Sequence, residues 1–177
     1  FISENFGADV SYDSATGGIT VTKKADNGGS VIVGTVDKKF IGDSYYKWSI
    51  ENPKDMKMST RYFDGTFTEF AYDENNWIDI TVFAKGEDYD FEKEFSEWKS
   101  LMKDLTLVVA DNNTTDPKKK IMHIQAKNKT ETRDIYEIET RKYIYRARGG
   151  FENEKTEIKD EGLRILSTFD AAFVSGD

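Results

Sequence analysis

The side chains in this chain that could do chemistry are carboxylates and a single histidine. The 177 residues include 33 Asp and Glu, one His and no Cys. Without Cys, disulfides, thiolate catalysis and thiolate metal sites are excluded, and one histidine cannot form a multi-histidine copper site. His123 lies in the strand-like run 121–126. Because spacing assigns it no serine or carboxylate partner, we expect it to be packed or hydrogen-bonded rather than catalytic.

The carboxylates raise two further possibilities. Acidic side chains cluster at 73–74 and 87–90, and a facing pair could serve a glycosidase, although 33 acidic residues make such clusters uninformative. The polar segment 111–120 offers oxygen ligands for calcium at Asp111, Asn113 and Asp116. It lacks the glycine and the terminal glutamate of a twelve-residue calcium loop. We therefore predict no catalytic residue, no cofactor-binding residue and no metal-binding residue.

The overall charge limits the partners. A formal net charge of −8 and a pI near 4.8 argue against binding to DNA, RNA or anionic lipid, which requires a cationic surface. No apolar run approaches the roughly 20 residues of a membrane helix, so we expect no membrane span. Because the chain begins at Phe1 without Met, we interpret it as a processed product or a fragment, with an export signal in its parent reading frame.

Strand patterns dominate the stretch from Tyr46 to Ala84, which we interpret as a run of antiparallel strands in one sheet. Residues 67–72 and 78–83 alternate between apolar and polar or small side chains, as strands with one buried face do. They should pair across the turn at Asp73–Asn76.

A helix should follow this sheet. Asp90 is a suitable N-cap. Apolar side chains then recur at helical spacing at Phe91, Phe95, Trp98, Leu101, Met102 and Leu105. This stripe should pack on the sheet, although an aromatic stripe could instead line a ligand groove. The polar segment 111–120 after it should be a surface loop.

The C-terminal third predicts a hairpin and a last helix. Residues 135–140 and 143–148 should be two strands that flank Arg141-Lys142. Because Arg and Lys are unfavourable in a tight two-residue turn, we expect a four-residue loop between the strands. An even-length loop pairs Thr140 with Tyr143, Ile138 with Tyr145, Glu137 with Arg146 and Tyr136 with Ala147. The last helix should open near Asn153, with Gly162 packed closely on the sheet. Its apolar stripe would be Ile158, Leu163, Ile165, Leu166, Phe169 and Phe173.

One face of this hairpin carries opposed charges. Arg141, Arg146 and Arg148 could form an anion site, but Glu137 and Glu139 lie beside them. We therefore expect a solvated, salt-bridged face.

The first residues predict a small hairpin of 9–13 and 19–23, with a further strand within 30–36. The pattern Phe-x-x-x-x-Phe-Gly-Ala-x-Val-x-Tyr-Asp-x-x-Thr-x-x-Ile-Thr-Val-Thr, which begins at Phe1, resembles the copper amine oxidase N-terminal-like unit of secreted and cell-surface bacterial proteins. The unit is incomplete here, at about 1–42, and it is a stalk module without copper ligands. Too small to fold alone, it should dock on the neighbouring domain or on a second copy.

Two later segments resemble the PsbP-like fold family. They are Trp48–Lys57, which is similar to the family's strand and following turn, and Ile165–Phe169, which is similar to its closing helix. The resemblance implies a PsbP-like α+β domain at about 43–177, an antiparallel β-sheet flanked by α-helices, preceded by the small hairpin-containing unit.

Together these features predict a non-catalytic extracellular binding or scaffolding module of a bacterial secreted or cell-surface protein. Its partner would be a protein or a cell-envelope component, and a homodimer through residues 1–42 is possible. Two alternatives stay open. One is a cation- or small-ligand-binding protein, which a ligand would stabilise; the other is a carboxylate-dependent hydrolase, which would need two buried carboxylates facing one another in a cleft.

Overall fold

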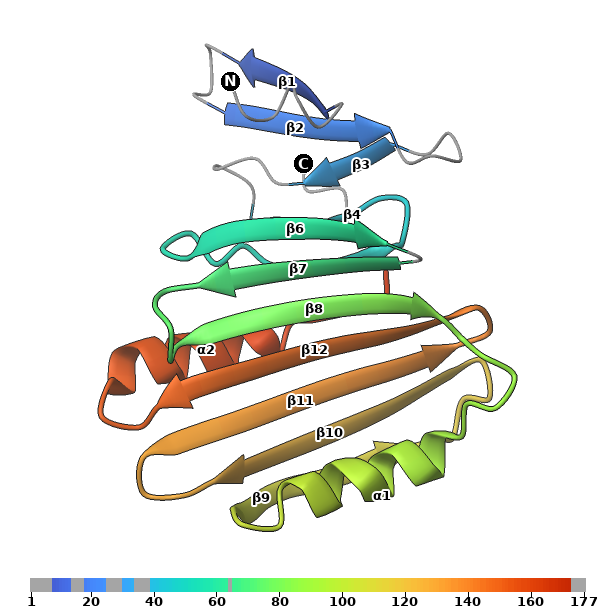
Figure 1. Cartoon of the computed structure of the whole chain (residues 1–177), viewed down its shortest axis with the longest axis vertical. Helices are drawn as coiled ribbons and strands as arrows, with labels where there is room; N and C mark the ends of the chain where they lie inside the picture. The colour runs from blue at the N-terminus through green and yellow to red at the C-terminus, as the bar shows by residue number, and fades with distance from the viewer. Residues whose placement is uncertain (1–7, 14–17, 25–29, 34–38, 64, 173–177) are drawn as a thin grey trace. The chain divides into compact units, whose positions relative to one another are not determined.

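The computed structural model describes the backbone of residues 8–13, 18–24, 30–33, 39–63 and 65–172, and the side chains of 39–61 and 65–172. The strands and helices of these ranges give an α+β fold, as the sequence predicts (Figure 1). In chain order they are β1 (Ala8–Asp13), β2 (Gly18–Lys24), β3 (Ser30–Val33), β4 (Phe40–Asp43), β5 (Trp48–Glu51), β6 (Lys57–Phe63), β7 (Gly65–Ala71), β8 (Trp77–Ala84), α1 (Phe91–Leu101), β9 (Thr106–Asn113), β10 (Lys119–Lys127), β11 (Glu131–Thr140), β12 (Tyr143–Glu152) and α2 (Thr156–Leu166).

The chain forms two compact units. One comprises residues 1–54 and 168–177, and the other comprises residues 55–167. The first unit contains a sheet of order β1-β2-β3 and a pair of strands, β4-β5. The second contains the seven-stranded sheet β6-β7-β8-β12-β11-β10-β9 together with both helices. The predicted division of the chain at residue 42 stays a prediction.

In the first unit, the predicted N-terminal hairpin is confirmed. Strands β1 and β2 pair antiparallel, with Val10 opposite Val21 and Tyr12 opposite Ile19, and β3 adds to β2. The turn between β1 and β2, residues 14–17, lies outside the described residues.

The single sheet predicted for Tyr46–Ala84 is wrong. Strand β5 pairs with β4, whereas β6, β7 and β8 belong to the seven-stranded sheet. The separation falls at the turn that contains Pro53, whose nitrogen has no hydrogen to donate to a strand ladder. Beyond β4, β5 pairs with the C-terminal residues, where the N–H groups of Ser49 and Asp170 each donate to the other residue's carbonyl at 2.9 Å.

In the second unit, the predicted pairing of β7 with β8 is confirmed. The two strands are antiparallel, with Phe70 opposite Ile78. The turn between them is closed by Asp73, whose Oδ1 accepts hydrogen bonds from the N–H groups of Asn75 and Asn76, both at 2.9 Å.

The predicted register of β11 and β12 is also confirmed. Glu137 lies opposite Arg146, and Ile138 lies opposite Tyr145. The connection is the two-residue turn Arg141-Lys142, not the expected four-residue loop. The hydroxyl of Thr140 accounts for this tight turn, because it donates to the Tyr143 carbonyl at 2.9 Å and accepts from the Tyr143 N–H at 3.2 Å.

Helix α2 packs on β12 and β8, on the face of β12 that carries Phe151. Gly162 makes this close approach possible, because a Cβ on it would lie 2.2 Å from the Phe151 ring. This confirms the predicted close packing on the sheet. The helix begins at Thr156 rather than near Asn153 and ends at Leu166, so Phe169 follows it instead of extending its stripe. The predicted position of Phe173 lies outside the described residues.

Helix α1 covers the opposite face of the sheet at β10 (Figure 1). The predicted cap is confirmed, since the Asp90 side chain accepts hydrogen bonds from the N–H groups of Glu92 and Lys93. Beneath the helix is a buried apolar cluster of Phe91, Met102, Met122, Ile124, Ala126 and Ile135. Leu101 does not join it and is 73% exposed, because the helix ends there and Met102 takes the buried position.

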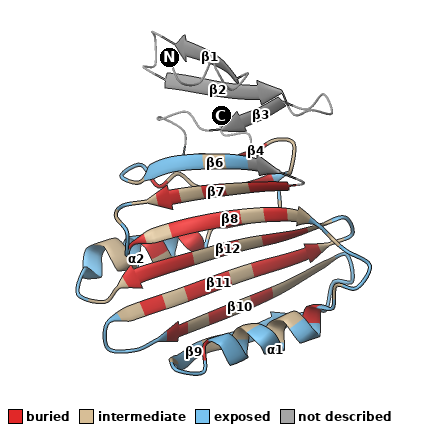
Figure 2. Cartoon of the chain, viewed as in Figure 1, coloured by how far each residue is buried: buried red, intermediate tan, exposed pale blue. Residues whose placement is uncertain are grey.

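The segment predicted as a surface loop at 111–120 is partly strand. Residues 111–113 belong to the edge strand β9, and residues 119–120 belong to β10. Both flanks are polar, but residues 111–113 pair with β10 and residues 119–120 pair with β11. Figure 2 shows the burial that results, with buried residues concentrated in the central strands and exposed ones along β6 and β9.

Candidate functional site

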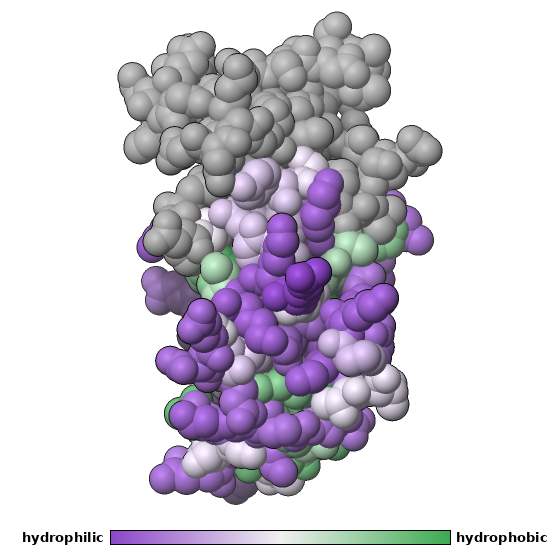
Figure 3. Space-filling view, turned by 90° about the vertical axis from the view of Figure 1, so that its right-hand side faces the viewer, coloured by the Kyte–Doolittle hydropathy of each residue, from purple (hydrophilic) through white to green (hydrophobic). Residues whose placement is uncertain are grey.

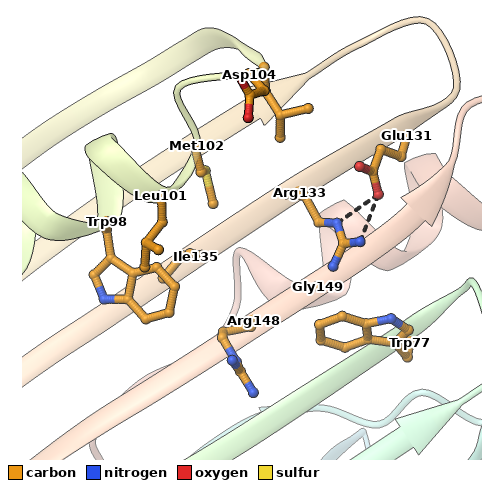
Figure 4. A pocket seen from close by; sticks show the side chains of 11 residues that line it. Trp77, Trp98, Leu101, Met102, Asp104, Glu131, Arg133, Ile135, Arg148 and Gly149 are labelled. Atoms are coloured by element: carbon orange, nitrogen blue, oxygen red, sulfur yellow. Dashed lines mark hydrogen bonds and ion pairs between the residues drawn. The ribbon is translucent and has the colours of Figure 1, made fainter.

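A cavity of about 350 Å³ opens where the C-terminal end of α1 meets β8, β11 and β12 (Figure 4). All of its lining residues belong to the second unit. They are Trp77, Trp98, Leu101, Met102, Asp104, Leu105, Glu131, Arg133, Ile135, Arg148 and Gly149. Two indoles, two guanidinium groups and an apolar floor therefore share one small space.

Trp77 is held at this place by a glycine on the neighbouring strand. It lies opposite Gly150 in the β8–β12 ladder. A Cβ on Gly150 would lie 2.9 to 3.0 Å from three atoms of the indole, so the ring packs on bare backbone. The guanidinium carbons of Arg133 and Arg148 lie 5.8 and 6.0 Å from the ring centroid, which is the outer range of cation–π attraction.

Carboxylates fix the orientation of both arginines. Arg148 donates from Nε and Nη2 to the two oxygens of Asp79, at 2.9 and 2.8 Å. Arg133 donates from Nε to Oε2 of Glu131 at 2.8 Å, and its Nη2 lies 2.7 Å from the same oxygen. Burial raises the pKa of Asp79, and the pairing with Arg148 offsets only part of that effect. Both guanidinium groups keep N–H donors that these bonds do not use.

Trp98 forms the α1 side of the cavity and covers a charged cluster. The guanidinium carbon of Arg146 lies 4.9 Å from its ring centroid. Arg146 also donates from Nε to Glu137 at 2.5 Å and from Nη2 to Glu94 of α1 at 3.0 Å. The hydroxyl of Tyr89 donates to Glu137 at 2.5 Å. Helix α1 and the turn before it are therefore bound to the sheet through polar groups.

The predicted solvated, salt-bridged face is wrong in its solvation. The Glu137 side chain is 0% exposed and that of Arg146 is 19% exposed. Glu139 is also buried and pairs with Lys85 and Lys120. The opposed charges are present as predicted, but α1 covers them.

The alternative anion site of three arginines does not form. Arg148 lies at the cavity, Arg146 lies under α1, and Arg141 lies in the exposed β11–β12 turn. The cavity instead uses Arg133 and Trp77, which no sequence motif marks as site residues. Strand register brings them together: Gly150 of β12 lies opposite Arg133 in the β11–β12 ladder and opposite Trp77 in the β8–β12 ladder.

His123 lies on the face opposite to the cavity. Its Nε2 is 2.7 Å from Oδ1 of the buried Asp134, and its ring stacks on Tyr136 at 4.0 Å between centroids and 11° between planes. The expectation of a packed, hydrogen-bonded histidine is confirmed. Burial, together with the Asp134 charge, raises the pKa of Tyr136.

The possible calcium ligands are dispersed. Asp111 and Asn113 lie on β9 and Asp116 lies in the following loop, where Oδ1 of Asn113 accepts from the N–H and hydroxyl of Thr115. Among the residues that the structure describes, no group of three or more His, Asp and Glu could hold a metal ion.

One face of the molecule is largely hydrophilic, and the helices of the described ranges are short. Figure 3 shows a face on which hydrophilic side chains predominate, as the composition suggests. Neither helix in the described ranges is long and apolar enough to cross a membrane.

Comparison with known proteins places the fold. The chain is similar to cyanobacterial PsbP (CyanoP) from Synechocystis sp. PCC 6803, whose solution structure it matches with a TM-score of 0.53 and 9% sequence identity. The match covers 78% of this chain and 94% of that chain. No family model matches the chain, and no curated protein matches it. The findings give no support to the copper amine oxidase resemblance of residues 1–42. At this identity the likeness establishes a PsbP-like fold.

Proposed function

We propose that this chain is a non-catalytic binding or scaffolding module of a bacterial secreted or cell-surface protein, and that its ligand binds in the cavity beside Trp77. The observation that carries the proposal is the lining itself, in which two tryptophans and two oriented arginines surround an apolar floor. Ligand sites typically combine aromatic walls with a few fixed polar groups in a volume of about 300–1,000 Å³. The cavity of about 350 Å³ has this character and favours a small ligand or one residue of a larger one.

The state of the buried carboxylates supports a non-catalytic reading. In the described part of the second unit, Asp79 pairs with Arg148, Asp134 with His123, and Glu137 with Arg146. A carboxylate-dependent hydrolase would need an acid and a base directed at a shared cleft. The carboxylates that line the cavity, Asp104 and Glu131, belong instead to its more exposed rim.

The cellular context in this proposal rests on sequence pattern. Residues 1–42 would be an incomplete stalk unit like that of the copper amine oxidase N-terminal region, and the partner would be a protein or a component of the cell envelope. A homodimer through these residues belongs to the same proposal. The parent reading frame tests the location. We expect an export signal in it, and a cytoplasmic start without one would contradict the extracellular assignment.

Thermal denaturation with a compound panel tests the cavity as the ligand site. The panel should contain neutral sugars, aromatic acids, amines and calcium chloride. A ligand of the native state raises the melting temperature, and we expect Trp77→Ala to abolish the rise.

Tyr72→Ala is the matched control, because Tyr72 is an aromatic residue that is 49% exposed and does not line the cavity. It should keep the full rise. If no compound stabilises the chain, or if Trp77→Ala responds as the wild type does, the cavity is not the ligand site.

A further inference from the structure

The charges around the cavity nearly cancel, and this balance restricts the charge of the ligand that the cavity could bind. Its lining contains two guanidinium groups, Arg133 and Arg148, and two carboxylates, Asp104 and Glu131. Arg148 is further neutralised by the buried Asp79. With Asp79 counted, the carboxylates outnumber the guanidinium groups by one, so an anion finds no site of net attraction.

The polar groups are nevertheless well placed for an uncharged ligand that both donates and accepts hydrogen bonds. Both contacts of Arg133 go to Oε2 of Glu131, so Oε1 takes no part in them. The two guanidinium groups keep unused N–H donors, and the Arg133 side chain is 42% exposed. The buried Asp79 holds Arg148 in position, which lowers the entropy cost of binding.

The apolar groups favour a flat ligand with C–H faces. Trp77 and Trp98 are both half-buried, each with a guanidinium group beside its ring. Aromatic rings at binding sites supply rigid contact area at low entropic cost. Figure 4 shows the two indoles on opposite sides of the space, with Arg133 and Arg148 between them.

We propose that the cavity binds a neutral sugar residue, with a C–H face of the ring against an indole and its hydroxyls hydrogen-bonded to Arg133, Arg148 and Glu131. A sugar ring combines an apolar face with several hydroxyls that donate and accept, and it carries no charge. The inference rests on the proposed function, because it names the ligand class of the same cavity.

The indole N–H signals of the three tryptophans provide the test, in a two-dimensional ¹H–¹⁵N NMR spectrum of the whole chain. The neutral probes are cellotetraose, maltotetraose and the tetramer of N-acetylglucosamine. The charged comparators are tetragalacturonate and phenylacetate. We expect at least one neutral tetramer to shift the Trp77 and Trp98 signals. Trp48 belongs to the other unit and is an internal control that should not respond.

The outcomes separate this inference from the proposed function. If a charged comparator shifts Trp77 and Trp98 and no neutral tetramer does, the cavity binds ligands but the sugar inference is overturned. If none of the probes shifts either signal, the sugar inference is overturned, and the compound panel alone then decides the proposed function. A shift of Trp48 equal to those of Trp77 and Trp98 would indicate non-specific binding and would also overturn it.

The affinity of the Arg133→Ala variant for the sugar tests the assigned hydrogen bonds, and Arg164→Ala is its matched control. Loss of its hydrogen bonds to the sugar should weaken binding about tenfold. Arg164→Ala removes a similar exposed ion pair, with Glu161 on α2, and should leave the affinity unchanged. Equal affinity of Arg133→Ala and the wild type would contradict the assigned hydrogen bonds.

Discussion

The two faces of the β11–β12 hairpin are covered by different helices in different ways. On the α2 face, apolar side chains such as Tyr145 and Phe151 are buried beneath a helix that approaches closely at Gly162. On the α1 face, the buried Glu137 forms an ion pair with Arg146, whose side chain is 19% exposed. The same two strands therefore bury apolar side chains against α2, and under α1 they place this ion pair beside the apolar cluster that contains Ile135.

The difference shows how a polar site can be built into a small fold. Apolar burial stabilises the α2 face in proportion to area, by about 25 cal/mol per Å². Under α1 the ion pairs must also offset the cost of removing charges from water. In return, where α1 ends, the strands present the oriented arginines Arg133 and Arg148 to the cavity.

The largest effect should come from breaking the charged interface. Arg146→Ala leaves Glu137, which is 0% exposed, without its guanidinium partner. An uncompensated buried charge costs about 3–5 kcal/mol, which urea denaturation would measure as a loss in the free energy of unfolding.

The double variant Arg146→Met/Glu137→Leu should recover most of that loss, because apolar replacements of a buried ion pair are often nearly neutral. A double variant as unstable as Arg146→Ala would mean that the charges themselves are required. A loss below about 1 kcal/mol for Arg146→Ala would show that this face is solvated.

A smaller loss should follow from breaking the apolar interface. Gly162→Ala places a Cβ 2.2 Å from the Phe151 ring. Despite the better helix propensity of alanine, we expect a net loss of about 1–3 kcal/mol from overpacking. Gly86→Ala is the control, since no atom lies within 4 Å of its Cβ position, and its thermal and urea transitions should match those of the wild type. A more stable Gly162→Ala protein would contradict the close packing of α2.

The smallest effect is on the pH dependence of stability, and it contrasts the buried carboxylate of Asp79 with the partly exposed carboxylate of Asp73. Burial raises the pKa of Asp79, so the folded chain holds this proton more tightly than the unfolded chain. Its contribution to the free energy of unfolding therefore falls as pH rises above about 3.9 towards the raised pKa. Hydrogen bonds from Lys155 and Asn76 lower the pKa of Asp73. Its contribution is present above about pH 3.9 and is lost as pH falls towards the lowered pKa.

Urea denaturation across the acid range separates the two. Asp79→Asn should make stability rise more steeply with pH, and Asp73→Asn should make it rise less steeply. The assignment fails if the two variants change the slope in the same direction.

The sequence predicted the parts of this molecule that depend on short separations. The β11–β12 register follows from alternation around two residues, and the Asp90 cap follows from side-chain type. The pairing of β8 with β12 joins residues such as Trp77 and Gly150 across the whole of α1 and three strands, and no local pattern specifies it. For the same reason the hairpin pattern alone predicts a solvated charged face, because the Glu94 side chain that meets Arg146 lies 52 residues away in sequence.

The candidate site was predictable only in pieces. Helical spacing predicts Trp98 in a core stripe, and the neighbouring arginines suggest Arg148 for an anion site, so each prediction uses only neighbours in sequence. Trp77 and Arg133 join them because three strands align in register at Gly150. Such an alignment is a property of the sheet, so a reading of separate strands does not reveal it.

A double-mutant cycle between Glu94 of α1 and Arg146 of β12 tests most directly whether α1 covers the charged face and so forms one wall of the site. Their side chains meet at 3.0 Å and are 30% and 19% exposed. The single and double alanine variants should give a coupling energy of about 1 kcal/mol or more. The exposed pair Lys93 and Glu97 within α1 should give about 0.3–0.5 kcal/mol in a parallel cycle. A coupling between Glu94 and Arg146 no larger than that reference would contradict the account, because it would place α1 away from the charged strands.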